Sequence, residues 1–346
     1  MTMTTVHIPL GPRAYDMHIG AGLLEKSGAL IAETLRPTRV LLVTDSNVAK
    51  YQHCSSAVQS LEAQGIACNT FTFPAGEASK SLYTYGKILD ACTGFTLNSG
   101  DALIALGGGV TGDLTGFAAA TYRRGIAFVQ MPTTLLAAVD SSVGGKTGVN
   151  LNAGKNLAGA FWQPRLVITD PETFETLPPA EYANGVAECL KHGVLFDEGL
   201  FAALEGGGPV SEAQIARNVE LKRGAVIGDE RDTGKRRKLN LGHTLGHAIE
   251  QTSGYTIPHG AAIGLGMLMM ARVFCPAIED RLRAALEKNH LPTQCEFTAR
   301  ELFSALEQDK KRAGGDITVV APLKIGRCEL RTLPMEAFQR LLEERL

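Results

Sequence analysis

Short β-rich runs alternate with helical ones over about the first 175 residues, and this alternation constrains the fold more than any other feature of the chain. Five runs have the length and composition of buried strands: RVLLVTD (39–45), CNTFTF (68–73), DALIAL (101–106), IAFVQM (126–131) and RLVITD (165–170). Amphipathic segments separate most of them, which predicts a parallel sheet covered by helices. Two earlier runs, VHIPL and AYDMHIG, predict an N-terminal hairpin.

The pattern changes after the proline-rich segment ETLPPAEY. Long helical patterns then dominate, over 179–195, 211–227, 243–253, 260–274 and 279–289. Two short β-like runs, ITVVAPL and GRCEL, interrupt them before a last helix from Met335. We therefore predict an α/β N-terminal domain with a mostly parallel sheet over 1–176, and a mostly α-helical C-terminal domain over 177–346. A length of 346 residues also favours two domains.

The charge balance limits what the chain can bind. It carries 34 Lys and Arg against 36 Asp and Glu, which argues against a nucleic-acid binder held by bulk charge. Seven cysteines without a CxxC pair suit a reduced compartment. The longest apolar stretch, 260–271, is well short of the ~20 residues that cross a bilayer, and no targeting segment is visible. We expect a soluble cytoplasmic protein that binds neither nucleic acid nor membrane.

A glycine-rich turn follows the third of the five strand-like runs, in DALIALGGGVTGD, and precedes a helical segment. Its letters fit GxGxxG, in which glycine lets the backbone approach a pyrophosphate at a helix N-terminus; a tight turn that binds nothing is the alternative. The standard fingerprint has an acidic residue about twenty residues further on, whereas 126–139 contains none. Asp45, at the end of its strand, is the better candidate for the ribose, unless it only caps the segment that follows.

The segment SSVGGKTG partly matches the motif of an ATP-binding loop. GxxxxGK[ST] requires a glycine at the position of Asp140, so the match fails and ATP hydrolysis is not supported.

Three histidines lie within 17 residues, in GHTLGHAIE and IPHG, and Glu188 lies upstream in VAECLKHG. His243 and His247 are four residues apart, so they share a helix face, and Thr244 stands where a HExxH protease has its Glu. One carboxylate and two imidazoles would leave open coordination positions on Zn²⁺ for substrate oxygens. The alternative is a helix cap with ordinary polar contacts, and the spacing does not choose between His243 and His247.

Cationic side chains are concentrated in or beside these segments. Each could be a solvated surface charge, but the interleaving of Lys146, Lys155 and Asn156 with glycines in GGKTGVNLNAGKNLAG predicts a loop that wraps an anion. The implied ligand is a phosphorylated acid. The cations concerned are Arg124, Lys146, Lys155, Lys191, Lys222, Arg236 and Lys310.

Together the segments resemble the 3-dehydroquinate synthase family over nearly the whole chain. The motifs are PAGEASKS, GGGVTGDLTGFAAATYRRG, PTTLLAAVDSSVGGKTGVN, GKNLAGAFWQP, ETLPPAEYANGVAECLK, LNLGHTLGHAIE, HGAAIGLGM and the late DKK. The resemblance implies a Rossmann-like first domain, bound NAD, bound Zn²⁺ with Co²⁺ as a substitute, and a homodimer.

The resemblance also implies roles for individual residues. It implies zinc ligation by Glu188, His243 and His259, with His247 on the substrate side, and a phosphate contact from Arg124 to the neighbouring subunit's site. The NAD contacts it implies are Asp45, Glu77, Lys80, Gly109, Val110, Thr111, Gly112, Asp113, Thr133, Thr134, Lys146, Lys155, Thr173, Phe174, Glu175 and Thr176. The substrate contacts it implies are Asp140, Lys146, Asn156, Lys191, Lys222, Arg236, Asn240, His247 and Lys310.

The implied reaction converts 3-deoxy-D-arabino-heptulosonate 7-phosphate, a phosphorylated sugar acid, to 3-dehydroquinate and phosphate in the shikimate pathway of aromatic amino-acid biosynthesis. NAD oxidises a hydroxyl transiently, phosphate leaves, hydride returns, and ring opening with an aldol closure completes the carbocycle. An inosose- or valiolone-forming cyclase and a metal-dependent polyol dehydrogenase are the alternatives. Arg236, with Lys222 and Asn240, matches the carboxylate-binding pattern and argues against such a cyclase.

Three positions depart from the family pattern. Leu241 stands where Phe is common, Ala261 where Glu is frequent, and His192 where an aromatic residue is frequent. None of them removes a ligand or a charged contact, so they concern local packing and the surroundings of the metal. For the late lysine contact we favour Lys310 over Lys311.

Overall fold

A seven-stranded sheet organises the first half of the chain. The computed structural model describes residues 3–310 and 315–346, and the chain divides into two compact units, Met1–Leu177 and Pro178–Leu346. The strand order in the sheet is β1-β2-β9-β6-β5-β3-β4, and every neighbouring pair except β1 and β2 is parallel. The strands are β1 (Thr4–Ile8), β2 (Tyr15–Ile19), β3 (Arg39–Asp45), β4 (Ala67–Phe73), β5 (Ala102–Gly107), β6 (Ala127–Pro132) and β9 (Leu166–Thr169). The predicted hairpin and parallel strands are confirmed.

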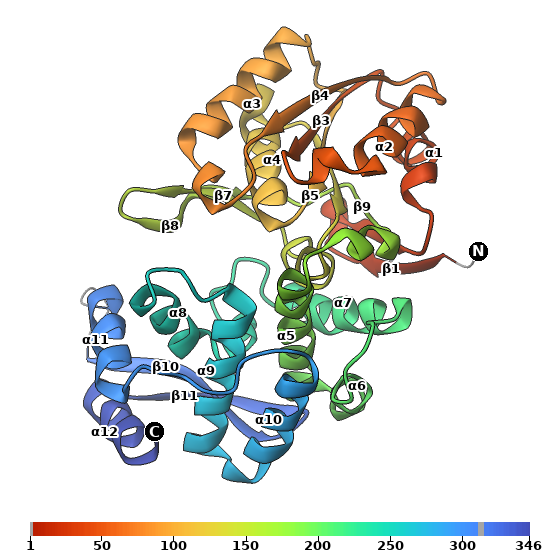
Figure 1. Cartoon of the computed structure of the whole chain (residues 1–346). Helices are drawn as coiled ribbons and strands as arrows, with labels where there is room; N and C mark the ends of the chain where they lie inside the picture. The colour runs from red at the N-terminus through yellow and green to blue at the C-terminus, as the bar shows by residue number, and fades with distance from the viewer. Residues whose placement is uncertain (1–2, 311–314) are drawn as a thin grey trace. The chain divides into compact units, whose positions relative to one another are not determined.

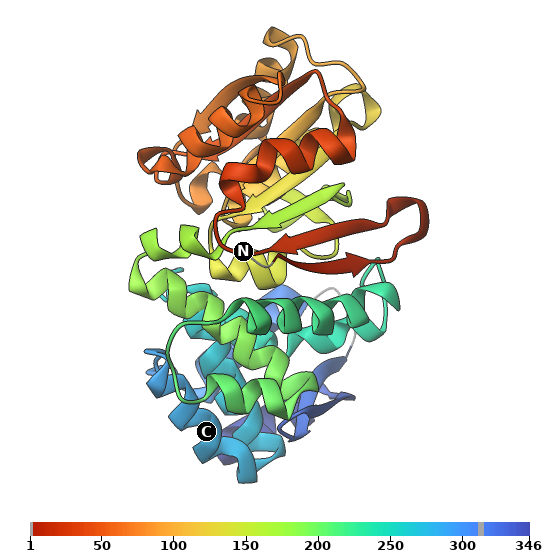
Figure 2. The ribbon, with the colours of Figure 1, turned by 90° about the vertical axis from the view of Figure 1, so that its right-hand side faces the viewer.

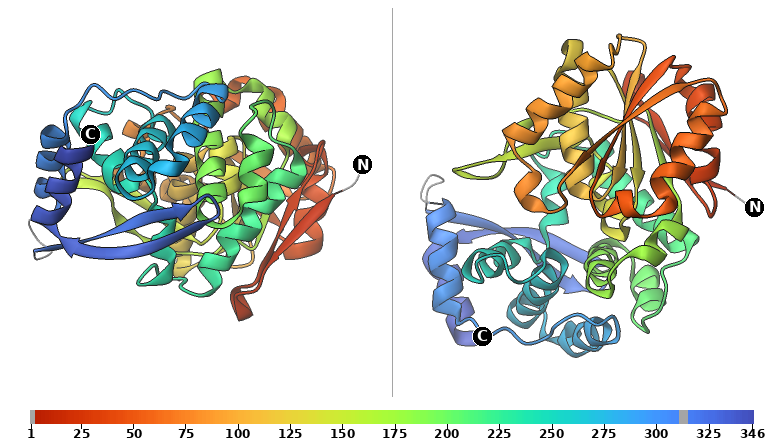
Figure 3. Two further views of the ribbon diagram at one scale, coloured as in Figure 1. Left: turned by 90° about the horizontal axis from the view of Figure 1, so that it is seen from below. Right: turned by 45° about the horizontal axis from the view of Figure 1, so that its top comes forward.

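Helices cover both faces of this sheet (Figure 1; Figure 3, right). In β3, Val40 and Leu42 pack on one face with α1 (Ser27–Leu35) and α2 (Gln52–Glu62). Leu41 and Val43 pack on the other face with α3 (Leu82–Gly94) and α4 (Gly109–Thr121). Because successive strand residues point to opposite faces, the consecutive apolar residues 40–43 of β3 need a helical layer on each face of the sheet.

The segment predicted as an anion-wrapping loop is instead an antiparallel hairpin of β7 (Lys146–Leu151) and β8 (Gly154–Phe161). Its glycines serve strand packing, because Gly148 faces Gly159 and a Cβ on Gly159 would stand 2.0 Å from the carbonyl oxygen of Thr147. The predicted loop is therefore wrong in structure. Glycines in that sequence allow two backbones to approach closely, which composition alone does not distinguish from an open loop.

The second unit is mostly helical (Figure 2). Its helices are α5 (Pro179–Phe196), α6 (Glu198–Leu204), α7 (Glu212–Ile227), α8 (His243–Thr252), α9 (His259–Phe274), α10 (Glu279–Lys288), α11 (Ala299–Lys310) and α12 (Met335–Arg345). The late β-like runs form an antiparallel pair, β10 (Asp316–Lys324) and β11 (Arg327–Pro334), drawn in blue in Figure 3, left. The sequence patterns single out neither α6 nor α11.

Helix α9 contains the long apolar stretch of the sequence. Every residue from Gly260 to Ala271 is buried within the protein, which explains an apolar run with no polar face. In the described residues, no helix has both the length and the apolar character needed to cross a membrane.

Candidate active site

The predicted cofactor residues of the first unit gather where parallel strands end. Asp45 ends β3, Gly107 ends β5, and the backbone N–H of Thr133, just after β6, donates to the Gly107 carbonyl at 3.1 Å. Thr111 Oγ1 donates to Asp45 Oδ2 at 3.4 Å, so the carboxylate faces the glycine turn. Carboxyl ends of parallel strands form the ligand crevice of such sheets.

Asp45 caps the turn that follows its strand, which is one of the two interpretations of this residue. Its Oδ1 accepts hydrogen bonds from the backbone N–H groups of Asn47 at 2.8 Å and Val48 at 3.1 Å, and so caps a short turn. Its Oδ2 remains directed toward Thr111. The glycine turn itself leads directly into α4, whose N-terminal N–H groups and helix dipole favour an anion such as a pyrophosphate.

A second cluster in the same unit centres on Lys80, which is buried. Its Nζ donates to Asp113 Oδ2 and to Asn156 Oδ1, each at 2.5 Å. Glu77 Oε1 accepts from Asn150 Nδ2 at 2.7 Å. The structure thus brings α4, the β7–β8 hairpin and the turn at 77–80 together, whereas Lys146 and Lys155 on the hairpin are exposed.

The remaining predicted residues of this unit lie on turns. Thr134 Oγ1 accepts from the backbone N–H of Ala137, which begins the π-helical turn Ala137–Ser141 that contains Asp140. Thr176 Oγ1 is 3.0 Å from His53 Nε2. Arg124 is exposed, with φ 64°, in the turn after α4. Thr173, Phe174, Glu175 and Thr176 lie in the 3-10 helix Pro171–Thr176, which follows β9.

In the second unit, three helices bring a carboxylate and two imidazoles together. Glu188, fully buried, is in the middle of α5, while His243 and His259 are the first residues of α8 and α9. Glu188 Oε1 is 3.8 Å from His243 Nε2 and 3.6 Å from His259 Nε2. These separations exceed hydrogen-bond lengths, and ligand atoms of all three residues lie within 4.8 Å of one another, a spacing that suits a shared cation.

The other ring nitrogens hold both histidines in orientation. His243 Nδ1 is 3.2 Å from the carbonyl oxygen of Leu241, and His259 Nδ1 is 3.2 Å from Glu250 Oε2. A proton on each Nδ1 serves these acceptors, and the ring is then turned so that Nε2 is directed toward Glu188. This is the arrangement by which neighbouring groups orient metal-ligating histidines, so the three residues fit a divalent metal.

Charges around the cluster shift its pKa values. Burial alone would raise the pKa of Glu188, but Lys191, which forms an ion pair with Glu188 Oε2, and the histidines hold it well below its usual range. Burial and then Lys191 lower the pKa of His243. Although burial lowers the pKa of His259, Glu188 and Glu250 raise it to about 9. A metal therefore has to displace a proton from His259.

His247 lies beside the cluster but differs from His243 in its surroundings. Its ring centroid is 5.4 Å from that of His243 and 6.1 Å from that of His259, and the residue is exposed. His247, Glu250 and His259 also meet the spacing for a shared cation. Of His243 and His247, His243 is the one grouped with the buried carboxylate of Glu188.

Three of the predicted cations are not solvated surface charges. Lys191 is 1% exposed, Lys222 on α7 is 5% exposed and Arg236 is 3% exposed. Arg236 Nη1 donates to the carbonyl oxygen of Glu230 at 2.8 Å, in the 3-10 helix Lys235–Asn240 that ends at the exposed Asn240. Buried cations need compensating anions or polar groups, which makes these three stronger candidates for anion binding than exposed lysines.

The late lysines cannot be placed in the same way. Lys310 is the last residue of α11, and its side chain is outside what the structure describes. Lys311 lies outside the described residues.

Glu250 was missed by the sequence reasoning. It is seven residues after His243, two helical turns along the same face of α8, and its carboxylate orients His259. The periodicity of GHTLGHAIE could have identified it as a residue of the same face, although not its contact with α9.

Gly260 fixes the approach of α9 to α5, and we expect Gly260→Ala to disturb the metal cluster. A Cβ there would stand 2.4 Å from Asn184 Cα and 2.5 Å from its carbonyl oxygen. The overpacking should cost about 1–3 kcal/mol of unfolding free energy and displace His259, which directly precedes Gly260. Thermal unfolding and Zn²⁺ titration measure the two effects.

The control is Gly224→Ala in the last turn of α7, where a Cβ meets nothing within 4 Å. Because alanine is the better helix former, this variant should be at least as stable as the original chain. Equal stability and equal Zn²⁺ affinity of the two variants would contradict the close-packing argument.

The fold, with a glycine turn at the strand ends and a Glu-His-His group on the helices, is that of the sugar-phosphate cyclases. A 2-deoxy-scyllo-inosose synthase complexed with carbaglucose-6-phosphate, NAD⁺ and Co²⁺ matches with a TM-score of 0.87 and 25% identity, over 99% of this chain and 100% of that one. The 2-epi-5-epi-valiolone synthase of Streptomyces hygroscopicus subsp. jinggangensis, with NAD⁺ and Zn²⁺ bound, matches with a TM-score of 0.83 and 26% identity, over 96% of this chain and 97% of that one.

The sequence comparisons are more specific than the class. Residues 70–184 match the N-terminal 3-dehydroquinate synthase family and residues 185–312 the C-terminal one. The 3-dehydroquinate synthase of Rhodospirillum rubrum is 44% identical over 92% of this chain and 89% of that protein. The chain belongs to the 3-dehydroquinate synthase family, which confirms the resemblance read from its motifs.

Proposed function

We propose that the protein is a lyase that converts 3-deoxy-D-arabino-heptulosonate 7-phosphate to 3-dehydroquinate and phosphate, and that it requires NAD⁺ and a divalent metal. The observation that carries the proposal is the grouping of His243 and His259 around the buried carboxylate of Glu188, which also pairs with Lys191, in a chain of this family. Zn²⁺ is the metal we assign, with Co²⁺ as a substitute, because one carboxylate and two imidazoles leave positions open for substrate oxygens.

Each cofactor has one chemical task when bound. NAD⁺ accepts and returns a hydride, and the metal lowers the cost of forming an alkoxide at the substrate hydroxyl. Glu188, His243 and His259 hold the metal, and Glu250 keeps His259 turned toward it. The carboxyl edge of the sheet holds the dinucleotide, for which we retain the sixteen contacts from Asp45 to Thr176 that the resemblance implies.

The buried cations bind and orient the substrate anions. Lys191, Lys222 and Arg236 are held in place by burial, so they can fix one conformer of a flexible sugar acid and thereby contribute positioning to the rate. We propose that Arg236, Lys222 and Asn240 bind the carboxylate of the substrate. The further substrate contacts we propose are Asp140, Lys146, Asn156, His247 and Lys310.

We propose a homodimer in which Arg124 reaches the phosphate held by the partner, because Arg124 is exposed in a left-handed turn and has no task within its own unit's clusters described above. We propose a cytoplasmic enzyme, consistent with seven free cysteines among the described residues.

Phosphate release from the heptulosonate phosphate tests the activity. Purified protein with NAD⁺ and Zn²⁺ should release one phosphate per substrate without accumulating NADH, because the hydride returns in each turnover. Phosphate assay and absorbance of NADH are recorded together, and light scattering of the same sample gives the oligomeric mass. A sugar phosphate without a carboxylate and glycerol are the control substrates.

The control substrates separate the rival activities. Preferred turnover of the sugar phosphate that lacks a carboxylate would indicate another cyclase. Steady NADH formation from glycerol, without phosphate release, would indicate a polyol dehydrogenase. Either result would contradict the proposal.

A further inference from the structure

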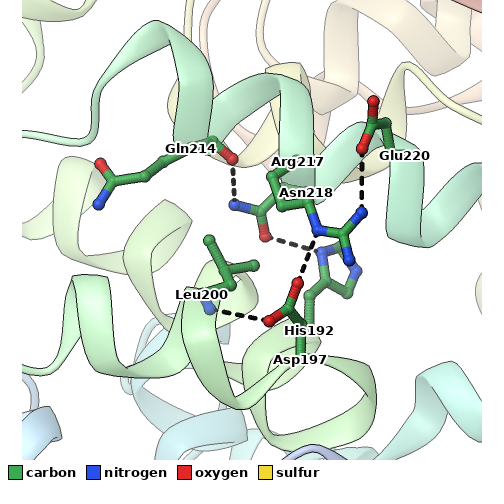
Figure 4. A network of polar contacts seen from close by, with 7 residues as sticks. All are labelled: His192, Asp197, Leu200, Gln214, Arg217, Asn218 and Glu220. Carbon is green, nitrogen blue, oxygen red and sulfur yellow. Dashed lines mark hydrogen bonds and ion pairs between the residues drawn. The ribbon is translucent and has the colours of Figure 1, made fainter.

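A fully buried hydrogen bond joins helices α5 and α7 next to the metal cluster. His192 on α5 and Asn218 on α7 are both 0% exposed, and His192 Nδ1 is 3.0 Å from Asn218 Oδ1 (Figure 4). Asn218 Nδ2 donates to the carbonyl oxygen of Gln214 at 2.8 Å. If either side chain were replaced, the other would be left as an unsatisfied polar group in the interior, which destabilises the fold. We therefore ask what this buried polar pair does.

The contacts of Asn218 determine where the imidazole carries its proton. Since its amide nitrogen donates to Gln214, its oxygen faces His192 and can only accept. The reversed amide would place two acceptors together at Gln214. His192 therefore carries a proton on Nδ1.

The two partners lie one helical turn from residues of the proposed active site. Glu188 precedes His192 by four residues on α5, and a ring nitrogen of His192 lies within 4.8 Å of a Glu188 carboxylate oxygen. Lys222 follows Asn218 by four residues on α7 and is also buried. Residues four apart share a helix face, so the hydrogen bond lies on the faces that carry Glu188 and Lys222.

A second polar contact between the same segments is exposed and serves for comparison. Arg217 Nε donates to Asp197 Oδ2 at 2.6 Å, and Arg217 also pairs with Glu220 at 3.0 Å (Figure 4). The Arg217 side chain is 48% exposed, and exposed ion pairs of this kind contribute little to stability. Arg217 thus links α7 to the end of α5 without touching the buried face.

We propose that the His192–Asn218 hydrogen bond is a positioning contact, which sets Lys222 on α7 relative to Glu188 and Lys191 on α5. The inference rests on the proposed function for the roles of these three residues. A directed hydrogen bond between buried helices fixes both their distance and their rotation, whereas an apolar contact of the same size fixes mainly the distance. His192 and Asn218 act through Lys222, Glu188 and Lys191 and are therefore positioning residues.

Single and paired apolar replacements test the proposal. His192→Phe and Asn218→Leu each leave one buried polar partner and should lower both the melting temperature and kcat/KM, the latter roughly 10–100-fold, as for other residues that orient ligands. The paired variant removes both partners of this hydrogen bond, so its melting temperature should recover relative to the single variants while kcat/KM stays at least tenfold low. His192→Asn, whose amide nitrogen can stand near the place of Nδ1, should restore much of kcat/KM.

Arg217→Ala is the control, and it should change neither kcat nor KM. If the paired variant recovers kcat/KM together with its melting temperature, the bond is only structural and the proposal is wrong. The same conclusion follows if the single variants lose stability but keep kcat and KM within twofold.

Two measurements keep this inference separate from the proposed function. The ¹⁵N chemical shifts of the His192 ring, recorded on the intact chain, should show a protonated Nδ1. This result is expected whether or not the protein turns over the heptulosonate phosphate. A proton on Nε2 alone would overturn the inference. Zn²⁺ titration of Asn218→Leu should show weaker binding than Arg217→Ala. Failure of phosphate release by the unaltered protein would instead count against the proposed function.

Discussion

Glu188→Gln is expected to lose metal binding and to reduce kcat/KM by at least roughly 10²–10³-fold, the cost of removing one preorganised electrostatic contact at a reacting centre. The amide keeps the shape of the side chain but removes the negative charge that His243 Nε2 and His259 Nε2 face at 3.8 and 3.6 Å. It also leaves the buried Lys191 without its ion-pair partner. Breaking such a pair from one side costs about 3–5 kcal/mol, so the melting temperature should fall as well.

Two further variants separate the loss of stability from the loss of metal. In Glu188→Gln/Lys191→Met the cation that faced Glu188 is gone as well, so stability should partly recover while the metal stays absent. Glu181→Gln, an exposed carboxylate in the first turn of the same helix, should leave both unchanged. Metal content after gel filtration, thermal unfolding and phosphate release provide the three readouts. Full Zn²⁺ occupancy of Glu188→Gln would remove Glu188 from the ligand set.

His259→Ala is expected to lose the bound metal, whereas His247→Ala should retain it. His259 directs Nε2 toward the buried carboxylate of Glu188 and is held by Glu250 through Nδ1. His247 is exposed and is not grouped with Glu188. With metal retained, His247→Ala should lose activity through the substrate, because we place His247 on that side.

Zn²⁺ per chain, measured after exhaustive dialysis, distinguishes the two variants, and phosphate release is assayed in parallel. His290→Ala serves as a histidine control outside both clusters. The opposite pattern, with metal kept by His259→Ala and lost by His247→Ala, would transfer the ligand role to the grouping of His247, Glu250 and His259.

The sequence predicted the fold of the first unit well because its signals are local. Buried parallel strands read as apolar runs, and glycine at 107–112 marks a strand-to-helix turn regardless of the rest of the chain. The hairpin of β7 and β8 was missed because its glycines allow the two strands to pack closely, with Gly148 opposite Gly159. Composition does not show which residues pair across strands.

The candidate site could be predicted only in part. The motifs named Glu188, His243, His247 and His259 as a group, but helical spacing alone left His243 and His247 equivalent. Glu250 and the pair of His192 and Asn218 required contacts between different helices. Burial likewise separated Lys191, Lys222 and Arg236 from the exposed Lys146 and Lys155.

The sequence by itself determined the family, the order of strands and helices along the chain, and the chemical types available for a cofactor and a metal, because periodicity and motifs depend on residues near one another in the chain. Only the tertiary structure decided that His243 Nε2 and His259 Nε2 face one buried carboxylate, and that the charged side chain of Lys191 is buried beside it. The physical reason is that distances across helices, and the exclusion of water that makes those charges matter, arise from packing between segments 55 to 71 residues apart rather than from any local pattern.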